Sequence, residues 1–360
     1  MYLNRSVEFL KKLFSEFNIK NVKIKNRICV PPMVVGFGHD GYVAPENVDR
    51  YKELAKGGAG LIIQEATCVS TDGLLSPKQL GIWKDDQIEG LKSIVDAVHV
   101  EDCQIFIQIH HAGVTGISEN PICPSSYEYN NFGKSVIGRE MTTEEIKFIQ
   151  NDYIKAARRA YEAGYDGVEL HGCHGYLISQ FLNKRVNKRT DEYGDNPEKF
   201  VIEILDGIRK VTPEEFVVGI RLGGFEPTIE DGLHYAKVLD KNGIDFLDIS
   251  YGFFQEQEMH VSEEYKFSNA VYASEKIKEE VSVPVFAVNG ISSPEIAEEI
   301  LNETNVDIVD IGKGVLINPN WANYARDGKD TGKCLNCAKC MWFGQSDVCP
   351  GKVMFDRNNQ

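Results

Sequence analysis

Two histidines and a tyrosine, His171, His174 and Tyr176, follow directly after a short apolar stretch that begins near Asp166. Side chains at the end of a strand in an α/β chain are held rigidly and can face a pocket. Both histidine rings can direct N–H groups at one oxygen, and a tyrosine with its ordinary pKa of about 10 is a neutral proton donor. Two donors for a developing oxyanion and one proton source suit the reduction of a polarised carbonyl system. Zinc binding, or a pair of core histidines, explains the same residues and stays open at this point.

The elements that must position these residues alternate along the chain. Short apolar stretches predict eight strands, and amphipathic stretches between them predict helices. The strands are expected at residues 26–33, 59–65, 104–110, 166–171, 216–222, 244–250, 283–288 and 306–311. Helices are expected at residues 45–56, 86–99, 142–164, 197–210 and 231–242. This number and order favour an α/β fold, a (β/α)8 TIM barrel, over an open doubly wound sheet.

The barrel is expected to form one domain, residues 1–328, because the sequence shows neither an internal repeat nor a linker within it. A short cysteine-rich tail, residues 329–360, follows, and we expect it to bind a metal and to pack on the barrel. One connection, residues 114–141, is long and rich in Pro, Ser, Asn and Gly. Loops of this size are more often lids or binding loops than plain connections. We expect this loop, with residues 251–272, to shape a substrate pocket.

The overall composition excludes several classes of partner. The chain has 360 residues, of which 42% are hydrophobic and 26% charged, as in an ordinary folded protein. Its net charge of −15 disfavours nucleic acid and anionic membranes as partners. No stretch has the length of a membrane span, and residues 1–17 lack the apolar core of a signal peptide. The nine cysteines do not form the pattern of a secreted disulfide framework, which favours a reducing cytoplasm.

Further candidates follow the predicted strands, at the rim that these strand ends share in a barrel. They are Pro32, Met33, Ala66, Gln108, Arg221, Gly290, Gly312 and Lys313. The last two loops of a barrel often hold a phosphate, because backbone N–H groups there favour an anion. Lys313 would add a positive charge to that site, although a lysine without this context is more often an ordinary surface residue.

Four thiols crowd the tail. They are Cys334, Cys337, Cys340 and Cys349, the last followed by Pro350. This spacing is closer to an iron–sulfur pattern than to paired zinc knuckles, so a [4Fe-4S] cluster and a structural Zn site are both open. Free thiols on a flexible tail are the third alternative. Trp342 and Phe343 are expected across the barrel mouth, at a subunit contact or in an ordinary buried patch.

Several stretches together form a pattern that covers nearly the whole chain. They are Lys25-Asn-Arg-Ile28 with Pro32-Met33, Gly60 to Thr67, Gln108 with His111-Ala-Gly113, Ala163 to His171, His174 to Leu177, Gln180-Phe-Leu182 and Asn187 to Gly194. In these stretches the chain resembles the old yellow enzyme family of FMN-dependent ene-reductases (NADH:flavin oxidoreductases), which includes the dienoyl-CoA reductases. The block from Ala163 to Gly194 is the specific part of the match.

The resemblance implies a role for each candidate. The isoalloxazine ring would be lined by Pro32, Met33, Ala66, Gln108 and Arg221, with Arg221 near its N1/C2 edge. The FMN phosphate would be held by Gly290, Gly312 and Lys313. His171 and His174 would bind the oxygen of an α,β-unsaturated carbonyl compound. Reduced flavin N5 would deliver hydride to the β carbon, and Tyr176 would protonate the α carbon. NAD(P)H would reduce the flavin in a separate half-reaction, so ping-pong kinetics are expected.

The chain also departs from the family pattern. Val34 stands where many bacterial members have a Cys or Thr that tunes the flavin, and Lys313 replaces a common Arg. The dienoyl-CoA reductase relatives carry a [4Fe-4S] cluster with wider cysteine spacings and a further FAD and NADPH-binding domain. Without such a domain, a cluster here would need a protein electron donor. Two alternatives therefore stay open. One is an iron–sulfur flavoprotein that is dienoyl-CoA reductase-like or amine dehydrogenase-like, and the other is a flavin redox sensor with little turnover. The identity of the small-molecule substrate and the presence of a homo-oligomer are also left open.

Overall fold

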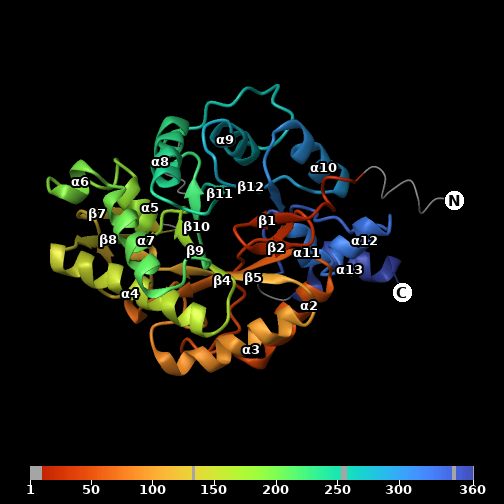
Figure 1. Cartoon of the computed structure of the whole chain (residues 1–360), viewed down its shortest axis with the longest axis horizontal. Helices are drawn as coiled ribbons and strands as arrows, with labels where there is room; N and C mark the ends of the chain where they lie inside the picture. Colours follow the sequence, from red (N-terminus) through yellow and green to blue (C-terminus); the bar gives the residue numbers. More distant parts are fainter. Residues whose placement is uncertain (1–9, 132–133, 253–257, 343–345, 360) are drawn as a thin grey trace.

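The computed structural model describes residues 10–131, 134–252, 258–342 and 346–359. Eight parallel strands close into a barrel, which lies at the centre of Figure 1 with helices around it. The strands are β3 (Ile28–Val30), β4 (Leu61–Cys68), β5 (Gln104–His110), β9 (Gly167–Gly172), β10 (Val217–Gly223), β11 (Phe246–Ser250), β12 (Val285–Ala287) and β13 (Ile308–Asp310). Their order around the barrel follows their order in the chain. The predicted (β/α)8 barrel is therefore confirmed.

Helices that join successive strands form the outer layer, as each parallel crossover requires. The main ones are α2 (Pro45–Lys56), α3 (Ile88–His99), α4 (Thr143–Glu162), α7 (Lys199–Val211), α8 (Ile229–Lys241), α9 (Asn269–Lys278) and α10 (Pro294–Glu303). Two short helices, α5 (Leu177–Leu182) and α6 (Glu192–Asp195), precede α7. A capping box opens α4: the Thr142 side chain accepts from the N–H of Glu145, and the Glu145 side chain accepts from the N–H of Thr142.

Along each barrel strand, inward-facing side chains alternate with outward-facing ones. The polarity of the inward-facing side chains changes from one end of the barrel to the other. Near the amino ends they are apolar, and Phe106 and Phe246 stack with ring centroids 5.4 Å apart. An antiparallel hairpin packs against this cluster and closes that end; it consists of β1 (Phe17–Ile19) and β2 (Val22–Ile24). Two residues further along β5 and β11 stand Gln108 and Asp248, both buried. The interior thus passes from an apolar plug to a polar layer beneath the carboxyl ends.

Residues 114–141, predicted to be a long loop, contain regular secondary structure. They contain a three-stranded sheet of β6 (Ile122–Cys123), β7 (Tyr127–Asn131) and β8 (Lys134–Glu140), in which β8 pairs with both other strands. The prediction was wrong because the alternation of tyrosines with polar residues is short and ends in asparagines, which are typical of turns. Tyr127 and Tyr129 pack on a small cluster of Val114, Cys123 and Val186, a contact that local sequence does not reveal.

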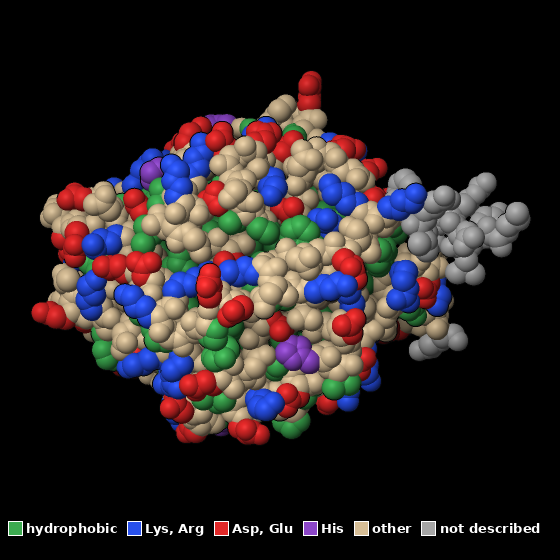
Figure 2. Space-filling model, viewed as in Figure 1, with side chains coloured by type: hydrophobic (Ala, Val, Ile, Leu, Met, Phe, Trp, Pro, Cys, Tyr) green, Lys and Arg blue, Asp and Glu red, His purple; other side chains and the backbone are tan. Residues whose placement is uncertain are grey.

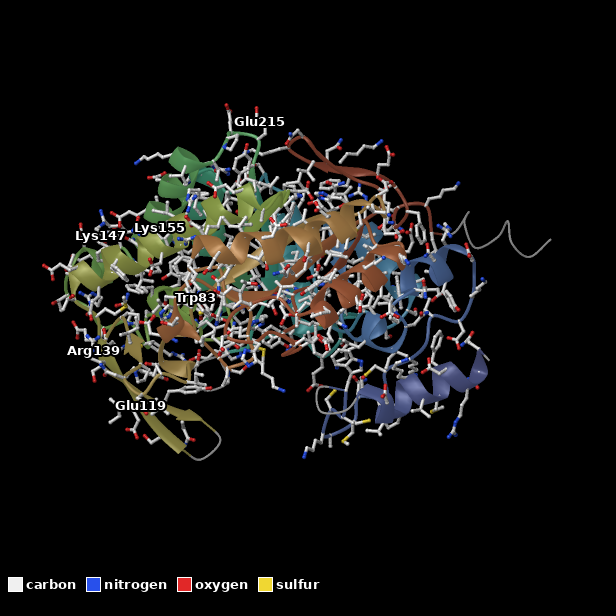
Figure 3. All side chains as sticks on the ribbon, turned by 90° about the horizontal axis from the view of Figure 1, so that it is seen from below. Trp83, Glu119, Arg139, Lys147, Lys155 and Glu215 are labelled. Atoms are coloured by element: carbon white, nitrogen blue, oxygen red, sulfur yellow. The ribbon has the colours of Figure 1, made fainter. Side chains whose placement is uncertain are left out.

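This sheet and the tail stand on the same side of the barrel. Both β7 and β8 contact the 3-10 turn η3 (Gly113–Thr115), which follows the carboxyl end of β5. Figure 3 shows the β7–β8 hairpin and the tail helix α13 (Pro350–Asn358) projecting on one side, at opposite ends of the molecule. The two segments therefore flank the rim that carries the predicted site.

The tail packs on the end of the barrel chain. After β13 come α11 (Lys313–Ile317) and α12 (Trp321–Arg326), and α13 contacts α11. The rings of Tyr324 and Phe355 lie 5.8 Å apart. Trp342 donates its Nε1–H to the carbonyl of Leu316 at 3.0 Å, and the Arg50 guanidinium lies 5.0 Å from its ring. Trp342 is thus held against α2 and α11 of its own chain, whereas Phe343 and residues 253–257 lie outside the described residues.

On the face shown in Figure 2, acidic and basic side chains are interspersed, and hydrophobic side chains form only small groups between them. The negative net charge is therefore not concentrated in one patch on this face. Among the described residues, no helix is both long and apolar enough to cross a membrane.

Candidate active site

A cavity of about 500 Å³ lies at the carboxyl ends of the barrel strands. Six of the eight predicted cofactor residues line it: Pro32, Met33, Arg221, Gly290, Gly312 and Lys313. They follow or end four different strands, so only barrel closure brings them together. Cofactor pockets in proteins have volumes of roughly 300–1,000 Å³, and this cavity is within that range.

Arg221 is a buried, charged residue among those that line this cavity. Its Nη1 lies 2.8 Å from Asp248 Oδ2 and 3.7 Å from Asp310 Oδ2. Burial lowers the pKa of Arg221, but the surrounding carboxyls, Asp248 foremost, more than offset this and raise it. The buried Nε of Arg221 makes no hydrogen bond to any residue that the structure describes. This N–H is therefore available to a group bound in the cavity.

Three buried carboxyls surround this one guanidinium, because Glu169 on β9 joins Asp248 and Asp310. Burial raises the pKa of all three, and the charge of Asp248 raises the pKa of Glu169 and Asp310 further. Glu169 and Asp310, whose pKa values are raised well above the usual value, therefore retain protons at a pH at which exposed carboxyls are ionised. The sequence analysis missed it, since isolated acidic residues inside predicted strands give no sign that three strands will meet at one arginine.

Two predicted cofactor residues, Ala66 and Gln108, do not line the cavity. The carbonyl of Ala66, in β4, accepts a hydrogen bond from Gln79 Nε2 at 2.8 Å. The side chain of Gln108 donates to Glu169 Oε1 at 2.8 Å. Both are buried in the layer beneath the rim, so contact of either residue with a cofactor stays a prediction.

The structure brings the three predicted catalytic residues together and adds two more. His110 Nδ1 lies 3.1 Å from His171 Nδ1, His171 Nε2 lies 3.0 Å from His174 Nδ1, and His174 Nε2 lies 2.9 Å from Ser250 Oγ. We call these four side chains the histidine row. The Tyr176 ring centroid is 4.5 Å from that of His110 and 4.6 Å from that of His171. Ser250 also lines the cavity and so connects the row to it.

Burial sets the protonation of this group. It lowers the pKa of His110 and His171 well below the usual value and that of His174 to about 3. The nearby charge of Arg221 lowers the pKa of His171 and His174 further. Burial also raises the pKa of Tyr176 to about 12. At neutral pH the row is therefore a set of neutral imidazoles beside a protonated phenol.

Glu226, which the sequence analysis did not single out, forms a hydrogen bond with the backbone of His174. Its Oε1 accepts the backbone N–H of His174 at 2.9 Å, and its Oε2 accepts a hydrogen bond from Ser179. Burial raises the pKa of Glu226 to about 7. The carboxyl lies against Gly223, where a Cβ would come within 2.4 Å of Glu226 Cδ. The glycine therefore leaves the room that this buried carboxyl occupies.

The zinc alternative keeps a geometric basis. His171, Cys173 and His174 each offer one ligand atom, and these atoms lie within 4.8 Å of one another. However, the two facing histidine nitrogens are hydrogen-bonded to each other, and burial raises the pKa of the Cys173 thiol well above its usual value. A protonated thiol is a poor zinc ligand.

The four tail cysteines line a second cavity of about 210 Å³. Lys313, Cys334 and Asn336 line both cavities, and Lys313 donates to Asn336 Oδ1 at 2.7 Å. Within the described part of the chain, no three tail sulfurs lie within 4.8 Å of one another. Thiolates on one tetrahedral zinc are about 3.8 Å apart, given Zn–S bonds of about 2.3 Å. The thiols therefore share a cavity, although no three of these described thiols are grouped as closely as the ligands of one zinc ion.

The closed parallel barrel with a cofactor-sized cavity at the carboxyl ends of its strands is the architecture of the old yellow enzyme class of flavin-dependent oxidoreductases. Residues 12–331 match the model of the NADH:flavin oxidoreductase / NADH oxidase family. The chain belongs to this family, and its class is that of FMN-dependent NAD(P)H oxidoreductases.

Individual relatives agree with this assignment. The chain is 37% identical over 344 residues to an NADH oxidase of Thermoanaerobacter brockii, covering 90% of this chain but about half, 52%, of the relative. It is 36% identical to an NADPH dehydrogenase of Bacillus velezensis, covering 88% of this chain and 94% of the relative. The solved old yellow enzyme homologue of Zymomonas mobilis superimposes with a TM-score of 0.76 and 26% identity, covering 90% of this chain and 95% of that one.

The residues present fit FMN. The Nε–H of Arg221, a cavity residue, has no partner among the described residues and is a donor for a polar ring edge. Exposed Lys313 offers a positive charge near Gly290 and Gly312. Pro32 and Met33 supply apolar surface on the same wall. A flat, polar-edged ring with a phosphate at one end matches this distribution of groups.

Proposed function

We propose that the protein reduces the C=C bond of α,β-unsaturated carbonyl compounds, with NAD(P)H as reductant. The observation that carries the proposal is the position of the histidine row. It begins at Ser250 on the cavity wall and places His171 and His174 next to Tyr176. A substrate oxygen bound there would lie beside the cavity that fits FMN.

The charge states of the residues support the roles. Because His171 and His174 are neutral, they offer N–H donors rather than cations to a carbonyl oxygen, and so polarise the double bond. Because the pKa of Tyr176 is raised to about 12, its phenol keeps a proton that it can pass to the α carbon. Bound FMN, reduced by NAD(P)H, would supply the hydride for the β carbon. Neutral donors also favour a carbonyl oxygen over the cationic nitrogen that an amine dehydrogenase would bind.

The β7–β8 hairpin lies close to the proposed proton donor. Tyr129 packs with Val114 and Val186 and is close enough to Tyr176 to raise its pKa. The hairpin therefore forms a wall beside the proposed proton donor. We infer that residues of this hairpin, rather than the barrel itself, select among enones.

Replacing Tyr176 with phenylalanine tests the proposal. We expect the rate of enone reduction to fall about 100-fold, the lower end of a general-acid contribution, while FMN content and flavin reduction by NAD(P)H are retained. The measurement is stopped-flow oxidation of the reduced enzyme by 2-cyclohexen-1-one. Tyr161→Phe, at an exposed position on α4, is the matched control. An unaltered rate in Tyr176→Phe would remove the proton-donor role, and a wild type with no enone turnover would remove the function.

A second proposal concerns the tail. We propose that Cys334, Cys337, Cys340 and Cys349 bind a [4Fe-4S] cluster that passes electrons from a protein donor, with structural zinc as the competing occupant. Two observations support this order: no three of the described tail thiols lie within 4.8 Å of one another, and the tail cavity shares walls with the larger cavity. All nine cysteines are free thiols, which suits a reducing cytoplasm.

Absorption spectra of anaerobically purified protein, with iron, zinc and sulfide analysis, distinguish these outcomes. Flavin bands with broad iron–sulfur absorption and matching sulfide would support the cluster. Flavin bands with zinc alone would make the tail structural and leave NAD(P)H as the direct reductant. Flavin reduced by NAD(P)H without turnover of any enone would favour the redox-sensor alternative.

A further inference from the structure

His110 is buried at the end of β5 and belongs to none of the predicted functional sets. It is nevertheless the inner end of the histidine row, 3.1 Å from His171 through the two Nδ1 atoms. Its other ring nitrogen, Nε2, is buried and makes no hydrogen bond to any residue that the structure describes. The contact with His171 is thus the one ring hydrogen bond of His110 in that part of the chain.

Each link between two rings joins nitrogen to nitrogen, so one atom must carry the proton and the other must accept it. A neutral imidazole has a single N–H, and all three rings are neutral because burial depresses each pKa. The row therefore has two consistent hydrogen patterns. Either every ring donates toward Ser250, or every ring donates toward His110.

The two patterns differ in what they offer to a substrate oxygen. When the row donates toward Ser250, His171 and His174 both carry Nε2–H, and either group can turn its hydrogen bond to a carbonyl oxygen. When the row donates toward His110, both Nε2 atoms carry lone pairs, which repel a carbonyl oxygen. In the first pattern Ser250 accepts from His174 and keeps its own O–H for the cavity, which it lines.

We propose that His110 is a positioning residue that donates its Nδ1–H to His171 Nδ1, fixes His171 as the Nε2–H form and thereby makes His171 and His174 donors toward the substrate. The inference rests on the proposed function in one respect, that these two histidines bind a carbonyl oxygen. His110 touches neither substrate nor cofactor in this role. It acts through the hydrogen on the neighbouring ring.

Two variants separate the hydrogen bond from the space that the ring fills. In His110→Asn the amide nitrogen stands near the position of Nδ1 and can donate to His171, whereas His110→Leu fills similar space without a donor. We expect His110→Leu to weaken binding of 4-hydroxybenzaldehyde, which presents one oxygen as an enone does, and to raise KM for 2-cyclohexen-1-one, each about tenfold. His110→Asn should restore both to within about threefold of the wild type. Equal losses in the two variants, or no loss in His110→Leu, would overturn the proposal.

Nitrogen-15 NMR of histidine-labelled, FMN-loaded protein gives a readout that does not depend on turnover. The His171 signals are assigned by their loss in His171→Gln. We expect the wild type and His110→Asn to show the Nε2–H form of His171, and His110→Leu to show a mixture or the Nδ1–H form. A wild-type His171 in the Nδ1–H form would overturn the proposal even if the Leu variant does not fold. If the wild type reduces no enone, the proposed function fails while this measurement still decides whether His110 sets the hydrogen on His171.

Discussion

The carboxyl of Glu226 holds the backbone of His174 in a left-handed conformation. The Oε1 atom accepts the N–H of His174 at 2.9 Å, and the φ of His174 is 63°. A non-glycine residue with positive φ is strained by about 1–3 kcal/mol and persists where its surroundings enforce it. Here the enforcing group is a buried acid from another strand end. The orientation of His174 toward Ser250 therefore depends on a residue that does not line the cavity and contacts the row only through the backbone of His174.

The same carboxyl predicts how stability varies with pH. Burial raises the pKa of Glu226 from 4.5 to about 7, so the folded state binds the proton more tightly than the unfolded state. Its contribution is complete below pH 4.5 and is lost as the pH rises through 7. We expect the wild type to lose about 3 kcal/mol of unfolding free energy from this group between pH 4.5 and 8, and Glu226→Gln to avoid that part.

Urea unfolding at pH 5 and pH 8 measures this difference. Glu65, whose pKa burial also raises to about 7, should leave a residual slope in Glu226→Gln. Exposed Glu215, labelled at the edge of the molecule in Figure 3, is the control position, because Glu215→Gln changes only a solvated side chain. Parallel pH profiles for wild type and Glu226→Gln would contradict the raised pKa.

The carboxyl set around Arg221 predicts a pH-dependent flavin potential. Reduction adds negative charge to the flavin edge that Arg221 is proposed to face, and an ionised Asp310, 3.7 Å from that arginine, opposes it. Because burial raises the pKa of Asp310, this opposition should appear only at high pH. One charge at about 8 Å with an effective dielectric of about 20 is worth about 2 kcal/mol, or about 40 mV for two electrons.

We therefore expect Asp310→Asn to leave the midpoint potential unchanged at low pH and to raise it by about 40 mV at high pH. Spectroelectrochemical titration across that range makes the measurement. Asp206→Asn, at an exposed position on the outer helix α7, is the control for the loss of one negative charge. A constant difference at all pH values would mean that Asp310 is ionised throughout.

The features that the sequence could predict are those set by neighbouring residues in the chain, and the features that it could not predict depend on contacts between distant segments. The barrel strands were predictable because they are covered on both faces and read as apolar stretches. The cavity residues were predictable because strand ends of a barrel share one rim. The pairing of Asp248 and Asp310 with Arg221 was not, since it depends on which inward positions of separate strands reach the same level.

His110 shows the same limit over a shorter distance. The sequence pattern singled out its neighbour His111, yet consecutive residues of a strand face opposite sides. His111 Nδ1 accepts the N–H of Gly113 and its Nε2 lies 3.6 Å from Asp72, whereas His110 faces His171 inside the barrel. The register between β5 and β9, in which Gln108 pairs with Glu169 and Ile109 with Leu170, then brings His110 beside His171.

The last prediction concerns the hydrogen bond between Lys313 and Asn336, which joins the proposed phosphate end of the cavity to the cysteine tail. Asn336 stands between Cys334 and Cys337, so a metal on these thiols would fix the loop that holds Lys313. Removing that metal with a chelator should free the loop and weaken FMN binding about fivefold, the worth of one hydrogen bond of about 1 kcal/mol.

Asn336→Ala should weaken FMN binding by a similar factor and make it insensitive to the chelator, because the link is already broken. Titration of FMN fluorescence against apoprotein, with and without chelator, measures both effects. Asn120→Ala, at another exposed position, should behave as the wild type. If the chelator weakens FMN binding equally in wild type and Asn336→Ala, the tail acts on the cavity through another contact, and Cys334, which lines both cavities, becomes the residue to test.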